Sequence, residues 1–139
     1  KHEVAELFGM EYKEGLWKMS GHVCPKESAD QFLFVTLNKR RAEEDYRYHD
    51  YFKDGSHFHW QSQNRTTPSN EKGIGIVESN GRPGSIYLFV RKFPKINGKA
   101  APFTFCGRVN YLSHSGAGPI DVDFEMESPL TTGLYEFFC

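Results

Sequence analysis

The sequence predicts a mainly β domain of the α+β class, in which one short helix precedes a half-closed sheet. Two observations predict the sheet: about seven short runs of strand-forming residues, and turn signals such as Asn97-Gly98 between them. Helical spacing of apolar residues is found at the start of the chain. We see no internal repeat, so residues 1–139 are expected to form a single domain excised from a larger protein.

The first third of the chain predicts one helix and one buried strand. Three apolar residues at helical spacing indicate a short helix within residues 1–12, ended by Gly9. An extended arm is expected at residues 14–23. The run Gln31–Lys39 holds five apolar residues between polar ends, which is typical of a buried strand. A charged loop is expected at residues 40–45.

The middle of the chain predicts a hairpin. Strand-forming residues at Tyr46–Phe52 and His57–Gln63 flank an Asp-Gly turn at Lys53–Ser56. Alternate side chains of a strand share a face, and here both faces mix aromatic and polar groups. One face is therefore expected to line a cavity. Alternation places Tyr46, Tyr48, Asp50 and Phe52 together on the first strand, and Phe58, Trp60 and Ser62 together on the second.

The second half of the chain predicts further strands joined by loops. A loop is expected at residues 66–73, another at Ser113–Pro119, and a bend or bulge at Gly107. A tail from Pro129 to Cys139 is expected to dock through apolar side chains. The expected strands are Ile74–Ser79, Ser85–Lys92, Ala101–Leu112 and Ile120–Glu127.

Composition limits the possible functions. An apolar content of 38% with a net charge of −1 indicates a globular domain rather than a disordered one. A generic electrostatic DNA binder would be strongly basic, so any nucleic-acid site must depend on a local basic patch and a specific pocket. Three cysteines without a CxxC pair favour a reduced, cytoplasmic setting over a disulfide framework or zinc ribbon. No run approaches the roughly 20 apolar residues of a membrane span, so no membrane partner is expected.

Six blocks occur in a specific order along nearly the whole chain. They are VTLNK (Val35–Lys39), RYHDY (Arg47–Tyr51), FHWQSQN (Phe58–Asn64), LFVRK (Leu88–Lys92), APFTFCG (Ala101–Gly107) and YLSHSG (Tyr111–Gly116). This order resembles a bacterial domain family found at the end of long helicase-like chains. Family members often follow a phospholipase-D-type nuclease domain, and some accompany HNH nucleases.

The resemblance implies a role in type IV, modification-dependent restriction, and thus in antiphage defence. The domain would recognise 5-methylcytosine or 5-hydroxymethylcytosine, and would be related to SRA and other PUA-like domains, whose half-closed barrels take a flipped base into an aromatic pocket. The implied partners are double-stranded modified DNA and the helicase and nuclease domains of the same parent chain, in the bacterial cytoplasm. The domain itself would be no enzyme and would need no cofactor. The alternative is a structural or protein-docking module that does not read bases.

A pocket for a flipped cytosine needs a flat wall on each side and an acceptor for the exocyclic amine. Tyr48 and Trp60 are the expected walls, although Trp60 could equally be a core residue and Tyr48 a rim residue. Asp50 is the expected acceptor, unless it forms a structural ion pair with Arg47 or Arg65. Glutamine amides could read the base edge or simply be solvated. The expected base-binding residues are Tyr48, Asp50, Tyr51, His59, Trp60, Gln61 and Gln63.

Phosphate contacts are expected from a scattered set of side chains, each of which could instead be only solubilising. A metal site is not expected, because His57 and His59 share a face but lack evident further ligands. The Ser113-His114-Ser115 run near alternating acids is interpreted as a solvated strand face rather than a catalytic site, and Cys106 as a packed thiol. The expected phosphate-binding residues are Lys39, Arg47, Ser62, Arg65, Arg91, Lys92 and Arg108.

Overall fold

The structure is a computed structural model that describes residues 2–7, 21–25, 28–37, 50–62 and 66–138. The helices are α1 (His2–Leu7), α3 (Glu71–Val77) and α4 (Thr132–Phe138), with a 3₁₀ turn η2 (Ser79–Gly81). The strands are β1 (His22–Val23), β2 (Gln31–Thr36), β3 (Tyr51–Asp54), β4 (His57–Gln61), β5 (Ile86–Arg91), β6 (Lys95–Ile96), β7 (Lys99–Ala100), β8 (Thr104–Ser115) and β9 (Asp121–Met126). None of the described helices is long and apolar enough to cross a membrane.

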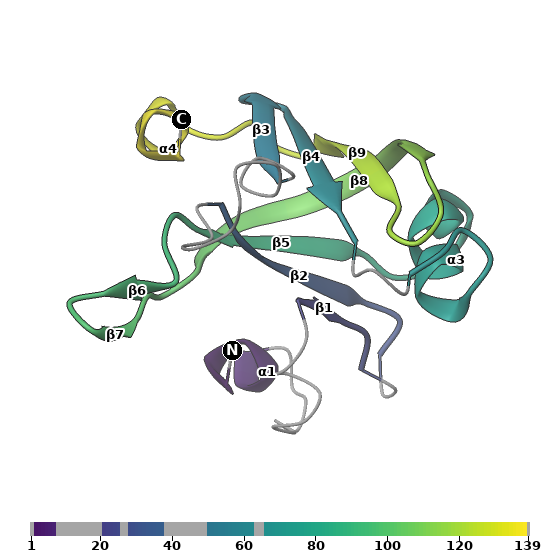
Figure 1. Cartoon of the computed structure of the whole chain (residues 1–139), viewed down its shortest axis with the longest axis horizontal. Coiled ribbons are helices and arrows are strands. Elements are labelled where there is room, and N and C mark those ends of the chain that lie inside the picture. The colour runs from purple at the N-terminus through teal and green to yellow at the C-terminus, as the bar shows by residue number, and fades with distance from the viewer. Residues whose placement is uncertain (1, 8–20, 26–27, 38–49, 63–65, 139) are drawn as a thin grey trace.

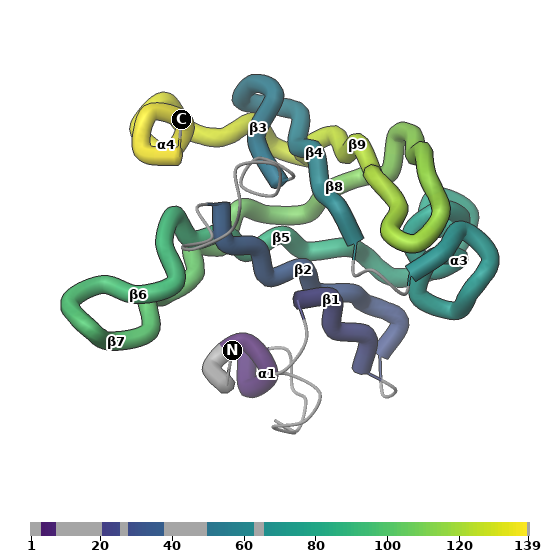
Figure 2. The backbone as a smooth tube through the Cα atoms, viewed as in Figure 1, coloured from purple at the N-terminus to yellow at the C-terminus, as the bar shows by residue number. Residues whose placement is uncertain are grey.

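One sheet of seven strands organises the fold, in the order β1-β2-β5-β8-β9-β4-β3 (Figure 1). The strands β2 and β5 are parallel and the other neighbours are antiparallel. The edge strands are β1, beside which α1 lies, and β3, beside which α4 lies (Figure 2). The predicted mainly β class is confirmed, but within the described residues the sheet is not closed into a barrel.

The sheet curls strongly, so that strands far apart in its order face each other. The clearest sign is the contact between Trp60 of β4 and His22 of β1, whose ring centroids lie 5.5 Å apart. These strands stand at positions six and one of the sheet order. The curled sheet therefore encloses space between β4 and the β1–β2 edge, and the candidate site lies there.

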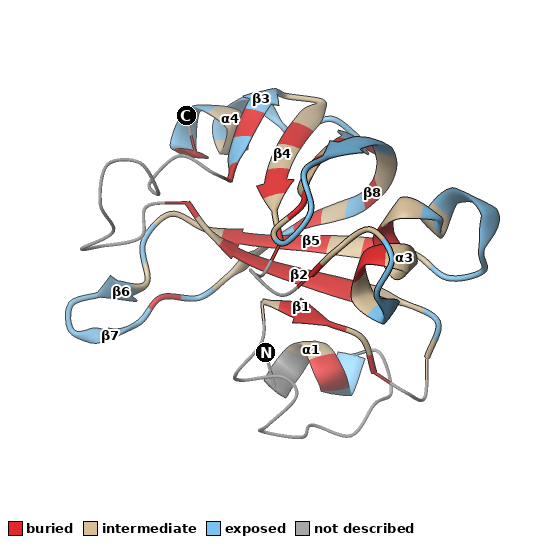
Figure 3. Cartoon of the chain, turned by 45° about the vertical axis from the view of Figure 1, so that its right-hand side comes forward, coloured by how far each residue is buried: buried red, intermediate tan, exposed pale blue. Residues whose placement is uncertain are grey.

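The main core fills the concave side of this sheet, and a smaller cluster covers the other side of β2 and β5. Leu33 and Val35 of β2 point into the main core, whereas Phe32 and Phe34 join the second cluster beneath α1. Burial on both faces appears as the red stretches of β2 and β5 in Figure 3. It explains why the β2 sequence is a continuous apolar run rather than an alternating one.

The predicted hairpin is confirmed in the part of the chain that the structure describes. Burial alternates along β4, with Phe58 and Trp60 inside. Across the turn, Phe52 pairs with Phe58, and a register shift follows between Phe52 and Asp54. Asp50 immediately precedes β3 and is also buried, so the predicted shared side of Asp50 and Phe52 is confirmed. Residues 46–49 and 63 lie outside the described residues.

The strand predicted at Ile74–Ser79 is wrong, because residues 71–77 form helix α3 and take over part of the loop predicted at residues 66–73. The side chain of Asn70 caps this helix by accepting a hydrogen bond from the amide of Gly73 at 2.9 Å. A Cβ at Gly73 would lie 1.6 Å from a backbone oxygen of Thr67, so only glycine fits this turn. Tertiary packing thus overrides the low helix propensity of β-branched residues and glycine.

The strand β8 lies three residues further along the chain than the predicted Ala101–Leu112, because Ser113–Ser115, assigned above to a loop, pair with Asp121–Asp123 of β9. The predicted bulge at Gly107 is confirmed, with a φ of 97° and a register shift in the facing strand β5. The tail docks as expected: Phe138 of α4 is buried and stacks on Phe52, with centroids 5.6 Å apart.

A second, two-stranded sheet is formed by the β6–β7 hairpin, which extends away from the body of the domain (Figure 1). Its turn residues Asn97 and Gly98 have φ angles of 53° and 78°. Two consecutive positive φ values are those of a type I′ turn, so the predicted Asn-Gly turn is confirmed.

Candidate functional site

A cavity of about 450 Å³ opens between β4 and the β1–β2 edge. This volume falls in the range of roughly 300–1,000 Å³ that is usual for small-ligand sites. The cavity combines apolar and aromatic surface with a few polar side chains, which is the composition of a specific binding site. It is lined by Gly21, His22, Phe34, Val35, Thr36, Asp50, Trp60, Gln61, Ser62 and Pro94.

Two aromatic side chains from different strands contribute to the cavity lining. Trp60 is 4% exposed and belongs to the main core, yet it also lines the cavity, so both interpretations of this residue apply. Phe34 lines the cavity from β2. Its ring is held by stacking on Phe89, with centroids 5.0 Å apart, and by an edge contact with Phe103. The ring of Phe34 thus packs in the second cluster, and Trp60 is the ring of the main core that borders the cavity.

Asp50 brings a carboxylate into the cavity. It is 6% exposed, and its Oδ1 accepts a hydrogen bond from the backbone amide of Gln61 at 2.8 Å. That bond fixes the carboxylate against Gln61, the residue that follows Trp60. Asp50 and Trp60 both line the cavity. A carboxylate can accept several hydrogen bonds, so the group can bind a donor on a ligand as well. Arg47 and Arg65, considered above as ion-pair partners, lie outside the described residues.

His22 lines the opposite side of the cavity as a neutral imidazole. Its pKa is lowered from 6.5 to about 4, chiefly by burial and to a smaller extent by the Lys72 cation, against the opposing effect of the hydrogen bond with Gln31. Its Nε2 lies 2.8 Å from Oε1 of Gln31, and the amide of Gln31 donates to the carbonyl of Gly75 in α3. An amide oxygen can only accept, so Nε2 carries the hydrogen and Nδ1 is an acceptor.

The helix α3 therefore supports the cavity wall from behind. Besides the Gln31 amide bond, Nζ of Lys72 donates to the backbone carbonyl of His22 at 2.6 Å. The first contact joins β2 to α3, and the second joins β1 to α3. The segment at residues 74–79, which the sequence predicted to be a strand, thus helps to position His22 of the cavity.

Ser62 fixes the far end of β4 to the start of β9. Its Oγ accepts from the amide of Ile120 at 2.9 Å, and its own amide donates to the carbonyl of Ile120 at 2.9 Å. These two contacts show a positioning role for Ser62, which was predicted to bind phosphate.

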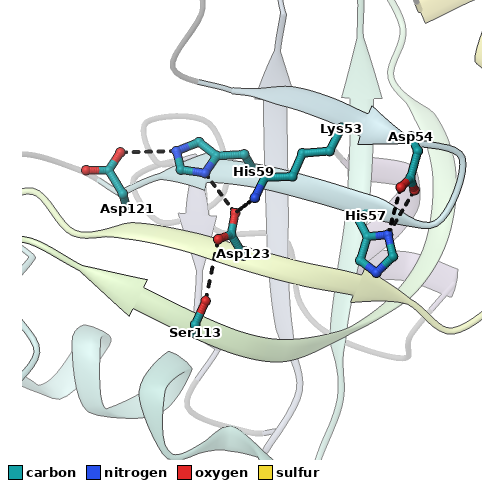
Figure 4. A network of polar contacts seen from close by, with 7 residues as sticks. All are labelled: Lys53, Asp54, His57, His59, Ser113, Asp121 and Asp123. Atoms are coloured by element: carbon teal, nitrogen blue, oxygen red, sulfur yellow. Dashed lines mark hydrogen bonds and ion pairs between the residues drawn. The ribbon is translucent and has the colours of Figure 1, made fainter.

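Two of the predicted base-binding residues lie on the outer face of the sheet instead. Tyr51 stacks on His59, with centroids 5.0 Å apart. Nδ1 of His59 lies 3.0 Å from Asp123, and its Nε2 lies 3.2 Å from Asp121 (Figure 4). Gln61 lines the cavity, but its side-chain amide donates to Asp121 at 3.3 Å.

Lys53 and Ser113 complete this outer network. Nζ of Lys53 lies 2.9 Å from Asp123, and Oγ of Ser113 donates to the same carboxylate (Figure 4). The hydrogen bond from Lys53 is the main reason why the pKa of Asp123 is lowered. No group of three or more His, Cys, Asp or Glu side chains among the described residues is arranged to hold a metal ion.

The predicted phosphate-binding residues do not form one group. Arg91 donates from Nε to Thr36 and from Nη1 to the carbonyl of Ala101, and its guanidinium lies 4.3 Å from the ring centroid of Phe103. Lys92 follows at the base of the β6–β7 hairpin. Arg108 is exposed on β8, opposite Tyr87 of β5. The predicted site residues outside the described residues are Lys39, Arg47, Tyr48, Gln63 and Arg65.

Sequence reasoning missed six cavity residues: Gly21, His22, Phe34, Val35, Thr36 and Pro94. Phe34 and Thr36 sit in a run that predicts only a buried strand. His22 lies in the predicted arm, where a lone histidine beside Cys24 carries no distinctive spacing. The strand-alternation signal that found Asp50 and Trp60 acts within one hairpin, and it cannot show which distant strand faces that hairpin.

Comparison with known proteins adds a family and a fold. The model of the DUF3427 family, described as a domain of unknown function, matches residues 1–138. The chain belongs to the DUF3427 family. No curated protein matches this chain. Among solved structures, it is similar to the MspJI restriction endonuclease in complex with a 27-mer oligonucleotide, with a TM-score of 0.51 and 14% identity. The match covers 76% of this chain but only 31% of that chain, and it shows a shared fold.

Proposed function

We propose that this DUF3427 domain recognises DNA that carries 5-methylcytosine or 5-hydroxymethylcytosine, by taking the modified base out of the duplex into the cavity beside Trp60. In this proposal it is the target-recognition domain of a type IV restriction endonuclease, and the helicase and nuclease domains belong to the same parent chain. The observation that carries the proposal is the cavity itself, in which the ring of Trp60 lies beside a buried carboxylate.

The cavity offers the groups that a flipped cytosine requires. The ring of Trp60 provides a surface on which a base can stack, which is typically worth about 1–3 kcal/mol per base. The exocyclic amine of cytosine is a hydrogen-bond donor, and the Asp50 carboxylate is an acceptor. Val35 adds apolar surface that suits a 5-methyl group.

The fold comparison is consistent with this role. MspJI, which shares the fold of this chain over part of its length, is a restriction endonuclease whose structure was solved with an oligonucleotide. In our proposal the curled sheet corresponds to the half-closed barrel of SRA and PUA-like base readers, and the cavity at its open side takes the flipped base.

The test is a pair of binding titrations with two duplexes that differ in a single 5-methyl group on cytosine. We expect tighter binding to the methylated duplex, and we expect Asp50→Asn to remove about 1–3 kcal/mol of that preference. The asparagine retains an oxygen for the Gln61 amide but presents an NH₂ donor where an acceptor is needed. Equal affinity of the wild-type domain for both duplexes would contradict the proposal.

The matched control is His59→Gln on the same strand, since His59 faces the outer network rather than the cavity. It should retain the preference for the methylated duplex. Thermal melting of each variant separates a loss of binding from a loss of folding.

A protein-docking role is the second candidate, and exposed aromatic surface favours it. Phe105 of β8 is 53% exposed and contacts Tyr87 and Phe89, with centroids 6.1 Å and 5.0 Å away. Such a surface could dock another domain of the parent chain. Binding that depended on Phe105, with little response to salt and none to cytosine methylation, would favour docking over base recognition.

A further inference from the structure

Positive charge is concentrated in one continuous part of the chain. No acidic residue occurs between Glu78 and Asp121, and residues 79–120 contain six cations. The rest of the chain holds the other 11 cations and all 18 acids, so a net +6 in the segment stands against −7 elsewhere, which gives the total of −1. The near-neutral total therefore hides a strong asymmetry, which is a feature of proteins that bind polyanions.

The β6–β7 hairpin carries two of these six cations, Lys95 and Lys99, on an exposed element. All six residues from Lys95 to Ala100 are exposed, and the hairpin appears as a pale blue extension in Figure 3. Lys95 pairs with Ala100, and Ile96 pairs with Lys99. Paired residues share a face of a ribbon, so Lys95 and Lys99 lie on opposite faces. The hairpin can thus present one cation on each side.

The base of the hairpin is fixed to the cavity. Pro94, which precedes β6, lines the cavity, and its carbonyl accepts from the amide of Ala101 at 3.0 Å. The same end is held by Arg91, which donates to the carbonyl of Ala101 and to Thr36 of the cavity lining. The type I′ turn at the tip keeps the ribbon short and defined. The hairpin therefore begins at the cavity lining.

From these observations we infer that the β6–β7 hairpin is a backbone-binding arm, in which Lys95 and Lys99 contact phosphates of the duplex beside the cavity. The inference rests on the proposed DNA binding and adds the element that holds the duplex. The arm is indifferent to cytosine methylation, because phosphates carry no information about the base. It therefore contributes affinity, and the cavity contributes selectivity.

The experiment measures how affinity for duplex DNA falls with salt, for the methylated and the unmodified duplex in parallel. Each phosphate contact adds about 0.9 to the slope of log K against log salt. We expect Lys95→Gln and Lys99→Gln each to make the slope shallower by about 0.9, and the double variant by about 1.8, on both duplexes. The ratio of affinities for the two duplexes should stay as in the wild type.

Two controls make the result specific. Arg82→Gln removes one cation of the same basic segment near α3, at the opposite end of the domain (Figure 1), where Arg82 pairs with Glu78 at 3.5 Å. It should leave the slope nearly unchanged. Lys95→Arg and Lys99→Arg keep the charge and should keep the slope. Both lysines are exposed, so these variants should melt at the wild-type temperature.

The outcomes separate this inference from the proposed function. An unchanged slope in the double Gln variant, or an equal change with Arg82→Gln, would overturn the arm even if the methylated duplex is preferred. A shallower slope without any preference for methylation would support the arm and contradict base recognition. Failure of the wild-type domain to bind either duplex would overturn both.

Discussion

The two faces of strand β4 differ in what surrounds their polar and aromatic groups. On the inner face, Trp60 and the adjacent Asp50 border a cavity. On the outer face, His59 lies between two aspartates, and Lys53 pairs with one of them. Both faces show the same mixture of residue types in the sequence. The comparison teaches that residue composition alone does not identify a site, whereas polar groups beside open volume do.

Charge extends this contrast. The outer face of β9 carries Asp121, Asp123 and Glu125, which would repel a phosphate backbone. The β5, β6–β7 and β8 region carries cations without any acid. Under the proposed function, this difference favours an approach of DNA along the hairpin side, away from the acidic face of β9.

The largest expected effect is on stability. Trp60→Ala should lower the free energy of unfolding by about 3–5 kcal/mol, because it removes a large side chain from the core. His59→Ala, one position away on the outer face, should cost less than about 1 kcal/mol, because surface ion pairs contribute little. Urea denaturation of both variants measures this difference. Similar losses would contradict the division of β4 into a packed face and a solvated face.

The second-largest expected effect is a loss of stability on acidification, through His22 in the cavity wall. The pKa of His22 is about 4 in the folded state against 6.5 in the unfolded state, so only the unfolded chain takes up a proton between these values. The stability from neutral His22 is therefore complete above pH 6.5 and lost as the pH falls toward 4. The loss should be on the order of 3 kcal/mol. Denaturation curves across this range measure it.

The outer carboxylates change stability in a different pH window. Hydrogen bonds lower the pKa of Asp54 and Asp123 below 3.8, so their stabilisation is present above pH 3.8 and is lost only at more acidic values.

His22→Gln should therefore flatten the stability profile between pH 6.5 and 4 without changing the profile below it. An unchanged slope in that variant would refute the account of His22.

A third prediction concerns the ring of Trp60 that borders the cavity. Trp60→Leu should weaken binding of methylated duplex by about 1–3 kcal/mol, because the leucine keeps apolar character but loses the flat stacking surface. Phe105→Leu on the exposed side of β8 is the matched control and should leave binding unchanged. The measurement is a fluorescence anisotropy titration. Equal losses in the two variants would show that the cavity has no special role.

The smallest effect is expected in the outer network. Asp123→Asn breaks the ion pair with Lys53, in which the two side chains are 32% and 43% exposed, so it should change stability by less than about 1 kcal/mol. It should not alter the preference for methylated DNA. A preference that vanished in this variant would move the site to the outer face.

The parts of the fold that sequence could predict are those set by local pattern. The alternation along His57–Gln61 correctly placed Trp60 inside, and the Asn97-Gly98 signal identified a tight turn. The helix α3 was missed because Ile74 and its neighbours favour a strand locally. What makes the helix possible is the close approach of Gly73 to Thr67, a contact that no local pattern reveals.

The site was partly predictable for the same reason. Asp50 and Trp60 come from one hairpin, so strand geometry alone predicts that they lie near each other. The opposite wall comes from β1 and β2, and its position depends on the curl of the whole sheet. That curl results from long-range packing, such as the 5.5 Å contact of His22 with Trp60. Pairing within a hairpin is readable from sequence, but contact across a curved sheet is not.

A crystal structure of the domain with a duplex that contains 5-methylcytosine tests the central claim most directly. We predict that the methylated base lies outside the helix, within the cavity beside Trp60, with its amine donating to Asp50. A bound duplex in which that base remains stacked and paired, while the cavity is unfilled, would contradict the account.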